Sequence, residues 1–427
     1  MTEMGNVYES VADAIGHTPL VRLRRVAQGI DAAVYAKLEF LNPGGSVKDR
    51  AAVSMIDAAE RDGSLRTGGT VVEGTSGNTG IGLTMVAASR GYHSIVVVPD
   101  KTSTEKIATL RAHGADVRVV SGARPTQHPE HVRNLAARIA AETPGGWLAG
   151  QYDNPANPDA HYRTTGPEIW QQTGGRITHF VAGIGTGGTV TGAGRFLKEA
   201  SAGQVRVIGA DPETSSYGGG DGRAFYIESV GHFVHPESIE DTWPASYDPT
   251  VLDTVERISD QESIDVVRDV ARRDGLLIGG SSGTAVAAAL RVARTLPADS
   301  MVVVILPDSG RSYVSKYFDP EWLQRFGFDG VAAPVAAEGP RAVRSTATIG
   351  EAREALGNRP TLPVVLGRAK LEPVVAAEIV GAIHLAHVAD APADDPITDY
   401  ISAALPLVGS GDSSGVVVHG GRVVDVR

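Results

Sequence analysis

Residues 1–325 alternate between short apolar runs and longer amphipathic stretches. The short runs are rich in β-branched residues, as buried strands are, and cover Val34–Phe40, Thr70–Glu73, Ser94–Val98, Asp116–Val120, Thr178–Ala182, Val205–Ala210 and Met301–Leu306. The amphipathic stretches have helical length and cover Val47–Asp62, Asn78–Arg90, Ser103–His113, Glu130–Glu142, Asp159–Gln172, Thr189–Ala200, Ser263–Asp274 and Ser281–Leu296. Alternating strands and helices predict an α/β fold, with a parallel sheet covered by helices.

The pattern changes after residue 329. Gly330–Pro340 is rich in Ala, Pro and Gly and reads as a linker. Two pairs of apolar runs then follow, each read as strand, turn, strand: Leu362–Leu366 with Glu378–Ile383, and Gly415–Val418 with Gly420–Val426. A helical stretch, Ile349–Leu356, precedes the first pair, but only the polar loop Gly409–Gly415 precedes the second. We expect a small α+β module, either regulatory or dimerising, or a purely structural appendage.

Composition narrows the classes of partner. The formal net charge is −11 and the pI is near 5.6, whereas a nucleic-acid partner requires clustered Lys and Arg, so none is expected. No apolar run approaches the ~18–20 residues of a membrane span, and the N-terminus carries acids without the basic region of a secretory signal. We expect a cytoplasmic protein without a membrane partner.

The chain has no cysteine, which excludes disulfides, thiolate–metal sites and cysteine nucleophiles. Three histidine pairs are spaced by three residues: His128 and His131, His232 and His235, and His384 and His387. Each pair could supply two zinc ligands, but no third ligand accompanies them. We therefore expect no metal site.

One lysine stands in a glycine-rich segment, Asn42–Arg50 (NPGGSVKDR). A lysine amine attacks a carbonyl only when neutral, and the positive end of a helix that opens at Ser46–Lys48 disfavours the ammonium. The flanking glycines let the backbone approach a flat ring closely. Lys48 is thus a candidate for a covalent bond to an aldehyde cofactor. The alternative is a surface lysine in a turn.

A second glycine-rich turn, Gly183–Thr189 (GIGTGGT), joins a strand to a helix. Its N–H groups and threonine hydroxyls can wrap a phosphate at the helix N-terminus. No lysine follows the glycines, so this is not a Walker loop. The nearest candidate for a ribose-binding acid, Asp211, is interpreted as a loop residue, which disfavours a dinucleotide. A tight turn without a ligand is the alternative.

Two further turns carry hydroxyl and amide groups at helix starts. Thr75–Gly80 (TSGNTG) has no charged side chain, which suits a carboxylate held by hydrogen bonds alone, and Asn78 could reach a ring hydroxyl. In Gly279–Gly283 (GGSSG), a serine could face a pyridine nitrogen without protonating it, which favours β-elimination and β-replacement over transamination. Helix capping is the alternative for both turns.

A reactive amine, a phosphate cradle and a small-anion cradle together are what pyridoxal 5′-phosphate (PLP) and an amino-acid substrate need. We therefore predict that PLP is bound through an imine to Lys48. A nicotinamide-dependent enzyme is favoured only by loose glycine spacing.

The motifs GGSVKDR, EGTSGNTGIGL, GIGTGGT, QYDNPANP and GGSSG follow the order seen in fold-type II PLP enzymes of the cysteine synthase and cystathionine β-synthase family, which the chain resembles over about residues 10–328. Four segments resemble the cystathionine β-synthase branch: Lys101–Lys106, Tyr162–Glu168, Asp211–Glu213 and Leu306–Tyr313. The tail resembles a degenerate pair of CBS motifs. This resemblance implies a tryptophan synthase β-like fold. A catalytic domain of two α/β subdomains would cover residues 1–329, the inner subdomain about residues 50–150. A linker would cover 330–345 and a truncated CBS-like module 346–427.

The resemblance also implies roles for single residues. Lys48 would be catalytic, holding PLP and then carrying the α-proton, while Asn78 would bind the ring hydroxyl and Ser281 the pyridine nitrogen. The phosphate would lie against Gly185, Thr186, Gly187, Gly188 and Thr189. The substrate carboxylate would lie against Thr75, Ser76, Thr79 and Gln151.

The implied reaction is PLP-dependent β-replacement, which condenses L-serine with L-homocysteine to cystathionine and water, in a homodimer. Cysteine synthase, acting on O-acetylserine and sulfide, is the alternative, and a non-catalytic ligand-sensing homologue is a further one. No haem is expected, because the N-terminus is short and cysteine is absent.

Three departures from the family pattern stand out. Ser229 replaces a usual glycine in the segment Tyr226–Gly231, and His232 follows where tyrosine or an acid is common. The stretch His232–Asp241 lengthens the same loop. The second CBS motif lacks its usual helix, so regulation by S-adenosylmethionine is not expected. The departures at Ser229, at His232 and in the lengthened loop leave the second substrate open.

Overall fold

The computed structural model describes residues 7–122, 124–331, 342–408 and 414–426. The chain divides into two compact units. Unit 1 consists of Met1–Glu213, Ile227–His232 and Thr242–Val314, and unit 2 of Thr214–Tyr226, Phe233–Asp241 and Ser315–Arg427. Most of the predicted linker and of the predicted polar loop before the second strand pair lies outside the described residues. The domain boundaries at 329 and 345 stay predictions.

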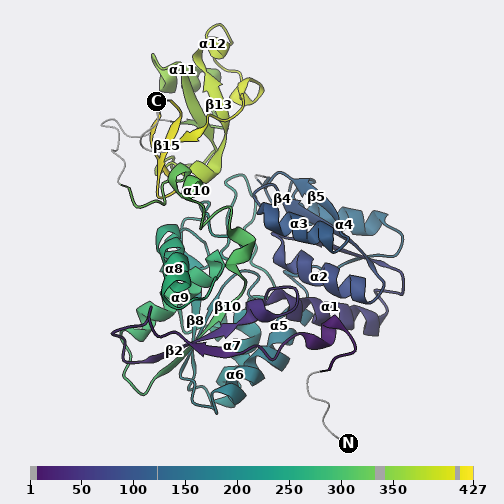
Figure 1. The fold of residues 1–427 in the computed structure, drawn as a ribbon. Helices are drawn as coiled ribbons and strands as arrows, with labels where there is room; N and C mark the ends of the chain where they lie inside the picture. Colours follow the sequence, from purple (N-terminus) through teal and green to yellow (C-terminus); the bar gives the residue numbers. More distant parts are fainter. Residues whose placement is uncertain (1–6, 123, 332–341, 409–413, 427) are drawn as a thin grey trace, which may run out of the picture. The chain divides into compact units, whose positions relative to one another are not determined.

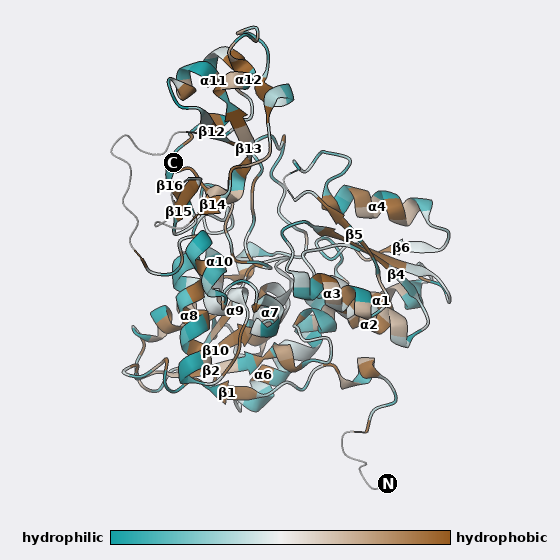
Figure 2. Cartoon of the chain, turned by 45° about the horizontal axis from the view of Figure 1, so that its top comes forward, coloured by the Kyte–Doolittle hydropathy of each residue, from teal (hydrophilic) through white to brown (hydrophobic). Residues whose placement is uncertain are grey.

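The larger sheet of unit 1 has six strands in the order β1-β2-β10-β7-β8-β9 (Figure 1). Their bounds are β1 Leu20–Arg22, β2 Ala33–Leu38, β7 His179–Gly183, β8 Arg206–Pro212, β9 Thr254–Ile258 and β10 Met301–Leu306. All neighbours are parallel except β1 and β2. Burial on both faces explains the unbroken apolar run of β10, which Figure 2 colours brown.

Helices α7 (Gly188–Ala200) and α9 (Gly280–Ala293) pack on this sheet, and α8 (Asp260–Arg273) packs on α9. Helix α9 is almost wholly buried, in keeping with its alanine-rich sequence. Helix α8 buries only one face and presents its acids and arginines elsewhere, so it is largely teal in Figure 2.

The smaller sheet of unit 1 has four parallel strands in the order β5-β4-β3-β6. They are β3 Thr70–Gly74, β4 His93–Pro99, β5 Asp116–Val120 and β6 Gly146–Leu148. The accompanying helices are α1 Lys48–Asp62, α2 Asn78–Ser89, α3 Thr104–Ala112 and α4 Val132–Glu142. Helix α1 packs against α2 and against α5 (Ala156–Ala160), and α5 in turn packs on α7.

All seven strands predicted over residues 1–325 are present, each within two residues of its predicted bounds. Three strands were missed. Two of them, β1 and β6, have only three residues, and β9 carries charged side chains that break its apolar pattern. The helix predicted over Asp159–Gln172 is divided into α5, a π-helical turn over His161–Thr165, and α6 (Gly166–Gln172). The predicted α/β class with parallel sheets is confirmed.

Unit 2 contains two three-stranded sheets, β11-β12-β13 and β14-β15-β16. In each, the first two strands are parallel and the last two antiparallel. Their bounds are β11 Val343–Arg344, β12 Thr361–Val365, β13 Ile379–His384, β14 Leu407–Val408, β15 Val416–His419 and β16 Arg422–Val426. The helices are α10 Pro320–Arg325, α11 Ile349–Leu356 and α12 Leu385–Val388. The strand pairs and the helix at 349–356 were predicted.

Candidate active site

Lys48 is the first residue of α1, where Val47 is the N-cap. Its side chain is partly buried, and burial lowers the pKa of its amine to about 8. The carboxylate of Asp308 opposes this shift, whereas the ammonium of Lys106 adds to it. The amine is therefore neutral for a larger fraction of molecules near pH 7 than an exposed lysine would be.

The turn Gly183–Thr189 links β7 to α7 and leaves no space for side chains at its glycines. Gly187 has φ +84°, and a Cβ on it would overlap Tyr247. A Cβ on Gly188 would overlap the side-chain amide of Asn157. That amide donates a hydrogen bond from Nδ2 to Oγ1 of Thr186 at 3.0 Å. No side chain of these glycines therefore covers the backbone at the N-terminus of α7, which suits an anion site.

A buried histidine lies beneath this turn. Nε2 of His161 is 3.2 Å from Oγ1 of Thr189, and Nδ1 is 2.9 Å from Oγ1 of Thr165. Burial lowers the pKa of His161 to about 3, so the ring is neutral and orients the Thr189 hydroxyl. His161 opens the π-helical turn, and its place under the turn was missed by sequence reasoning, because a π turn leaves no local pattern.

The turn Thr75–Gly80 ends at α2, whose N-cap Gly77 has φ +123°. Thr79 donates from Oγ1 to Oε1 of Gln151 at 2.5 Å, so these two predicted carboxylate-binding residues lie together. Gln151 in turn donates from Nε2 to Oε1 of Glu73 at 3.2 Å. Burial raises the pKa of Glu73 to about 7, although the hydrogen bonds from Gln151 and Gly150 oppose the shift.

Asn78 and Ser281 face the same region from α2 and α9. Asn78 donates from Nδ2 to Oδ2 of Asp308 at 2.8 Å, which uses one of the two N–H groups of its amide. The hydroxyl of Ser281 is buried without a hydrogen-bond partner. A buried hydroxyl without a partner costs free energy, so a ligand atom that hydrogen-bonds to Ser281 would be favoured here.

Most of the predicted cofactor residues line one cavity of about 20 Å³. They are Lys48, Asn78, Gly185, Thr186, Gly187, Thr189 and Ser281. Ser229 also lines it. The wall does not include Gly188 or any of the residues predicted to bind the substrate carboxylate, namely Thr75, Ser76, Thr79 and Gln151. Asn78, which is in the wall, belongs to the same turn as Thr75, Ser76 and Thr79.

A buried lysine that was not predicted as a site residue lies beside this cavity. Nζ of Lys106 donates to the Tyr313 hydroxyl at 2.7 Å and lies 3.2 Å from Oε2 of Glu228 and 3.3 Å from Oγ of Ser229. Tyr313 donates to Oδ2 of Asp308 at 2.5 Å, so the network continues to Asn78. The segment Lys101–Lys106 contains this lysine, but sequence reasoning did not predict its role, because its partners are more than 100 residues away in the sequence.

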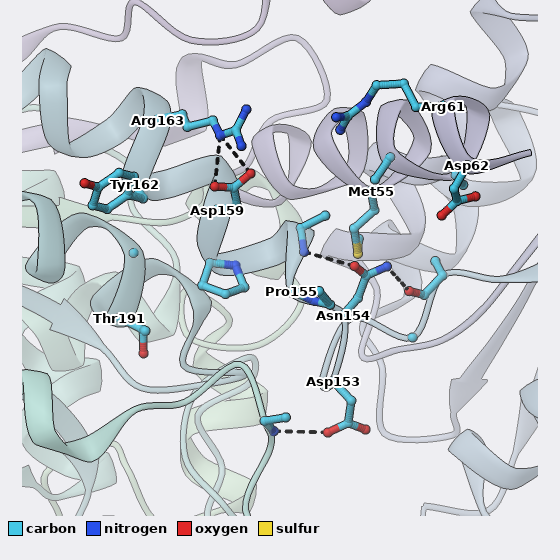
Figure 3. A pocket seen from close by; sticks show the side chains of 18 of the residues that line it. Met55, Arg61, Asp62, Asp153, Asn154, Pro155, Asp159, Tyr162, Arg163 and Thr191 are labelled. Atoms are coloured by element: carbon cyan, nitrogen blue, oxygen red, sulfur yellow. Dashed lines mark hydrogen bonds and ion pairs between the residues drawn. The ribbon is translucent and has the colours of Figure 1, made fainter. Parts of the chain in front are cut away.

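A much larger hollow of about 1250 Å³ contains none of these residues (Figure 3). Two ion pairs lie in its wall: Asp159 pairs with Arg163 at 2.8 Å and Asp248 with Arg195 at 3.2 Å. It offers no reactive amine and no glycine turn. The small cavity at Lys48 is therefore the candidate active site.

Comparison with known proteins decides the family. A family model described as "Pyridoxal-phosphate dependent enzyme" matches residues 11–308. The chain belongs to this family. The prediction of a PLP-dependent enzyme is thereby confirmed.

Named relatives divide between two activities. Cystathionine β-synthase of Apis mellifera is 43% identical over 75% of this chain and 64% of its own length, and that of Oryctolagus cuniculus is 42% identical over 75% and 58%. Cysteine synthase B of Escherichia coli K12 is 44% identical over 72% of this chain and 94% of its own. The chain thus spans about three fifths of the length of these cystathionine β-synthases and nearly all of the cysteine synthase.

Two solved structures share the fold. An O-ureido-L-serine synthase mutant with bound O-ureido-L-serine has TM-score 0.67 and 36% identity, covering 77% of this chain and 96% of its own. An O-acetylserine dependent cystathionine β-synthase from Helicobacter pylori has TM-score 0.65 and 40% identity, covering 73% and 98%. The predicted fold-type II architecture is therefore confirmed.

The residues of the site fit PLP. Lys48 supplies an amine of lowered pKa, the bare turn before α7 suits a phosphate, and the unpartnered hydroxyl of Ser281 suits a ring nitrogen. The cavity itself has a volume of about 20 Å³, room for about one water molecule. The roles of single residues stay predictions.

The described residues contain neither a membrane-spanning helix nor a cluster of metal ligands. Across them, no helix combines the length and apolar character of a membrane span. Over the same ranges, no three His, Cys, Asp or Glu side chains gather as metal ligands. The absence of haem, the homodimer, the cytoplasmic location and the CBS motifs stay predictions.

Proposed function

We propose that this chain condenses L-serine with L-homocysteine to cystathionine and water. The family and the relatives of both names support β-replacement on an amino acid. The observation that favours homocysteine over sulfide is the Lys106–Glu228 pair beside Thr75–Gly80, which we call the substrate turn. A zwitterionic second substrate carries a carboxylate and an ammonium that such a pair can receive, whereas sulfide offers neither.

The chain's own side chains support the α-proton step. PLP, when bound, supplies an electron-withdrawing ring that makes the α-proton of a bound amino acid acidic. The Lys48 amine, with its pKa near 8, then suits the removal and return of that proton near neutral pH. Ser281 faces the ring position without an acid that would protonate it, which disfavours a long-lived carbanion.

The substrate carboxylate has two kinds of donor available. Thr79 already donates to Gln151, so this pair acts by fixing the turn. The N–H groups of the first turn of α2 have no partner within the helix and point toward an anion in front of it. The Ser76 hydroxyl, 3.4 Å from that of Ser229, lies at the same end. No charged side chain is needed.

The test compares purified enzyme on two substrate pairs. We expect kcat/KM for serine with homocysteine to exceed that for O-acetylserine with sulfide by at least about tenfold, a difference of about 1.4 kcal/mol in transition-state binding. A preference of that size for the second pair would establish cysteine synthase instead. Absence of turnover with both pairs, in protein that binds PLP, would favour the ligand-sensing alternative.

Lys106→Met distinguishes a role of the Lys106–Glu228 pair in binding homocysteine from a role in stabilising the fold. We expect this variant to lose at least about tenfold in kcat/KM with homocysteine and much less with sulfide, because only homocysteine carries a carboxylate and an ammonium for the ion pair to receive. Lys101→Met, at an exposed lysine in the same segment, is the matched control. Equal losses with both nucleophiles would show that Lys106 only supports the fold.

A further inference from the structure

We call Gly183–Thr189 the phosphate turn. A short loop of unit 1, Ile227–His232, covers this turn, and we call it the cover loop. The N–H of Gly231 donates to the carbonyl of Ile184 at 2.7 Å, and a Cβ on Gly185 would lie only 2.9 Å from the carbonyl oxygen of Ser229. Ser229 adopts φ +68°, and its hydroxyl lies within 3.4 Å of Ser76. The loop therefore contacts both the phosphate turn and the substrate turn.

The backbone of Ser229 is held in a conformation that favours glycine. Such a position costs on the order of 1 kcal/mol for other residues, so the surroundings must fix it. Hydrogen bonds of Ser229 to Lys106 and Ser76 supply part of this restraint. The rest depends on where the two ends of the loop are fixed.

Both ends of the cover loop continue into unit 2. The stem before it is Thr214–Tyr226 and the stem after it is Phe233–Asp241. The two stems pair with each other, because the N–H of Val234 donates to the carbonyl of Gly222 at 2.9 Å. The six-residue loop thus spans two anchored ends, and the position of those ends limits its conformations.

One arginine of the C-terminal part of unit 2 binds both stems. Nη2 of Arg368 donates to the carbonyl of Gly222 at 3.1 Å and to that of Val234 at 3.0 Å. The same guanidinium pairs with Glu378 at 2.6 Å, and Glu378 accepts the N–H of Ala224 at 3.0 Å. The Arg368 and Glu378 side chains are 11% and 3% exposed, so water competes little for these bonds.

A second arginine, Arg223, binds the first stem to the C-terminal part of unit 2, residues 315–427, which we call the C-terminal module. Arg223 donates to four consecutive carbonyls: from Nη1 to Leu371 at 3.2 Å and Pro373 at 2.7 Å, and from Nη2 to Lys370 at 2.6 Å and Glu372 at 3.1 Å. Only the fork of a guanidinium can satisfy so many acceptors at once. The Tyr317 hydroxyl, which donates to the carbonyl of Tyr226 at 3.0 Å, fixes the last residue before the loop.

We propose that Arg368 is a positioning residue for the active site, which acts by clamping both stems of the cover loop. In this role the C-terminal module sets how often the loop opens above the phosphate turn. The cavity at Lys48 has a volume of only about 20 Å³, so we expect PLP and substrate to exchange when the loop moves. The structural part of this proposal stands by itself, and only its kinetic consequence rests on the proposed function.

The test measures hydrogen–deuterium exchange of the holoenzyme in peptides that cover residues 227–232. We expect Arg368→Met to speed exchange in the cover loop at least tenfold and to raise the rate at which PLP dissociates. Arg344→Met is the matched control, because Arg344 also donates to one carbonyl of the module, that of Ala369, but contacts neither stem. It should leave the cover loop unchanged.

Two further variants keep the test decisive. Arg368→Lys retains a positive charge opposite Glu378, but its shorter side chain places the ammonium short of the position from which Nη2 meets both carbonyls. It should therefore fold and still speed exchange in the loop, which covers the case in which Arg368→Met fails to fold. Ser229→Gly should loosen the loop while exchange in residues 368–378 stays unchanged. Unaltered exchange at 227–232 in both Arg368 variants overturns the proposal. If the proposed substrates are wrong, the turnover measurements change but the expected exchange rates at residues 227–232 do not.

Discussion

At the scale of single residues, the chemistry depends on groups whose surroundings change their ordinary properties. Burial lowers the pKa of Lys48 to about 8 and that of His161 to about 3. The first effect yields a reactive amine, and the second yields a neutral ring that orients Thr189. At pH 7 roughly a tenth of Lys48 is neutral, compared with less than about one in a thousand at its usual pKa.

This shift predicts how the apoprotein captures PLP. Because only the neutral amine attacks an aldehyde, the capture rate should rise about tenfold per pH unit below pH 8 and level off above it. Stopped-flow absorbance after mixing apoprotein with PLP measures this rate. Lys48→Ala should bind PLP without the covalent spectral change. A rate that keeps rising to about pH 10 would mean that Lys48 has an ordinary pKa.

At the scale of elements, close approach of two helices positions the phosphate turn. Gly188 and Gly192 lie one turn apart on α7 and face α5, where a Cβ would overlap Asn157 in the first case and the carbonyl of Pro158 in the second. The glycine stripe therefore lets the N-terminus of α7 meet the segment that carries Asn157, whose amide holds Thr186.

Gly192→Ala tests this contact without changing a group that binds ligand. We expect a loss of about 1–3 kcal/mol in the free energy of unfolding, because the added methyl pushes α7 away from α5. A weaker affinity for PLP should accompany it, measured by fluorescence titration of apoprotein. Gly350→Ala in α11 is the control, since its nearest neighbour lies 3.3 Å away. Equal stability of both variants would contradict the close contact.

At the scale of the whole molecule, the residues after 330 form one unit with segments from earlier in the chain. The linker-like composition of Gly330–Pro340 indicates instead that they could be removed. The sequence pattern predicts that deletion from Gly330 onward leaves a folded, active core. We expect a different outcome, because unit 2 includes residues 214–226 and 233–241 from within the predicted catalytic region. Arg223 and Tyr226 in these segments contact residues 370–373 and Gly421.

A truncation that ends at residue 329 is therefore expected to be impaired. Arg223 loses four acceptors and Tyr226 loses the Gly421 contact, so the stems of the cover loop should become mobile. We expect rapid proteolysis within residues 214–241 and a turnover reduced by at least about tenfold, measured beside the full chain. A truncated protein with full activity and resistant stems would restore the simpler view of an appendage.

The sequence by itself determined what depends on neighbours along the chain. Apolar runs located the strands, and glycine turns before helices located Lys48, the Gly183–Thr189 turn and Ser281, because strand burial and bare helix N-termini each leave a local pattern. Only the tertiary structure decided which distant groups meet. Lys106 reaches Glu228 and Tyr313, His161 lies under Thr189, and Arg368 joins both stems of the cover loop. Contacts between residues far apart in sequence depend on how the elements pack, and no local spacing encodes them.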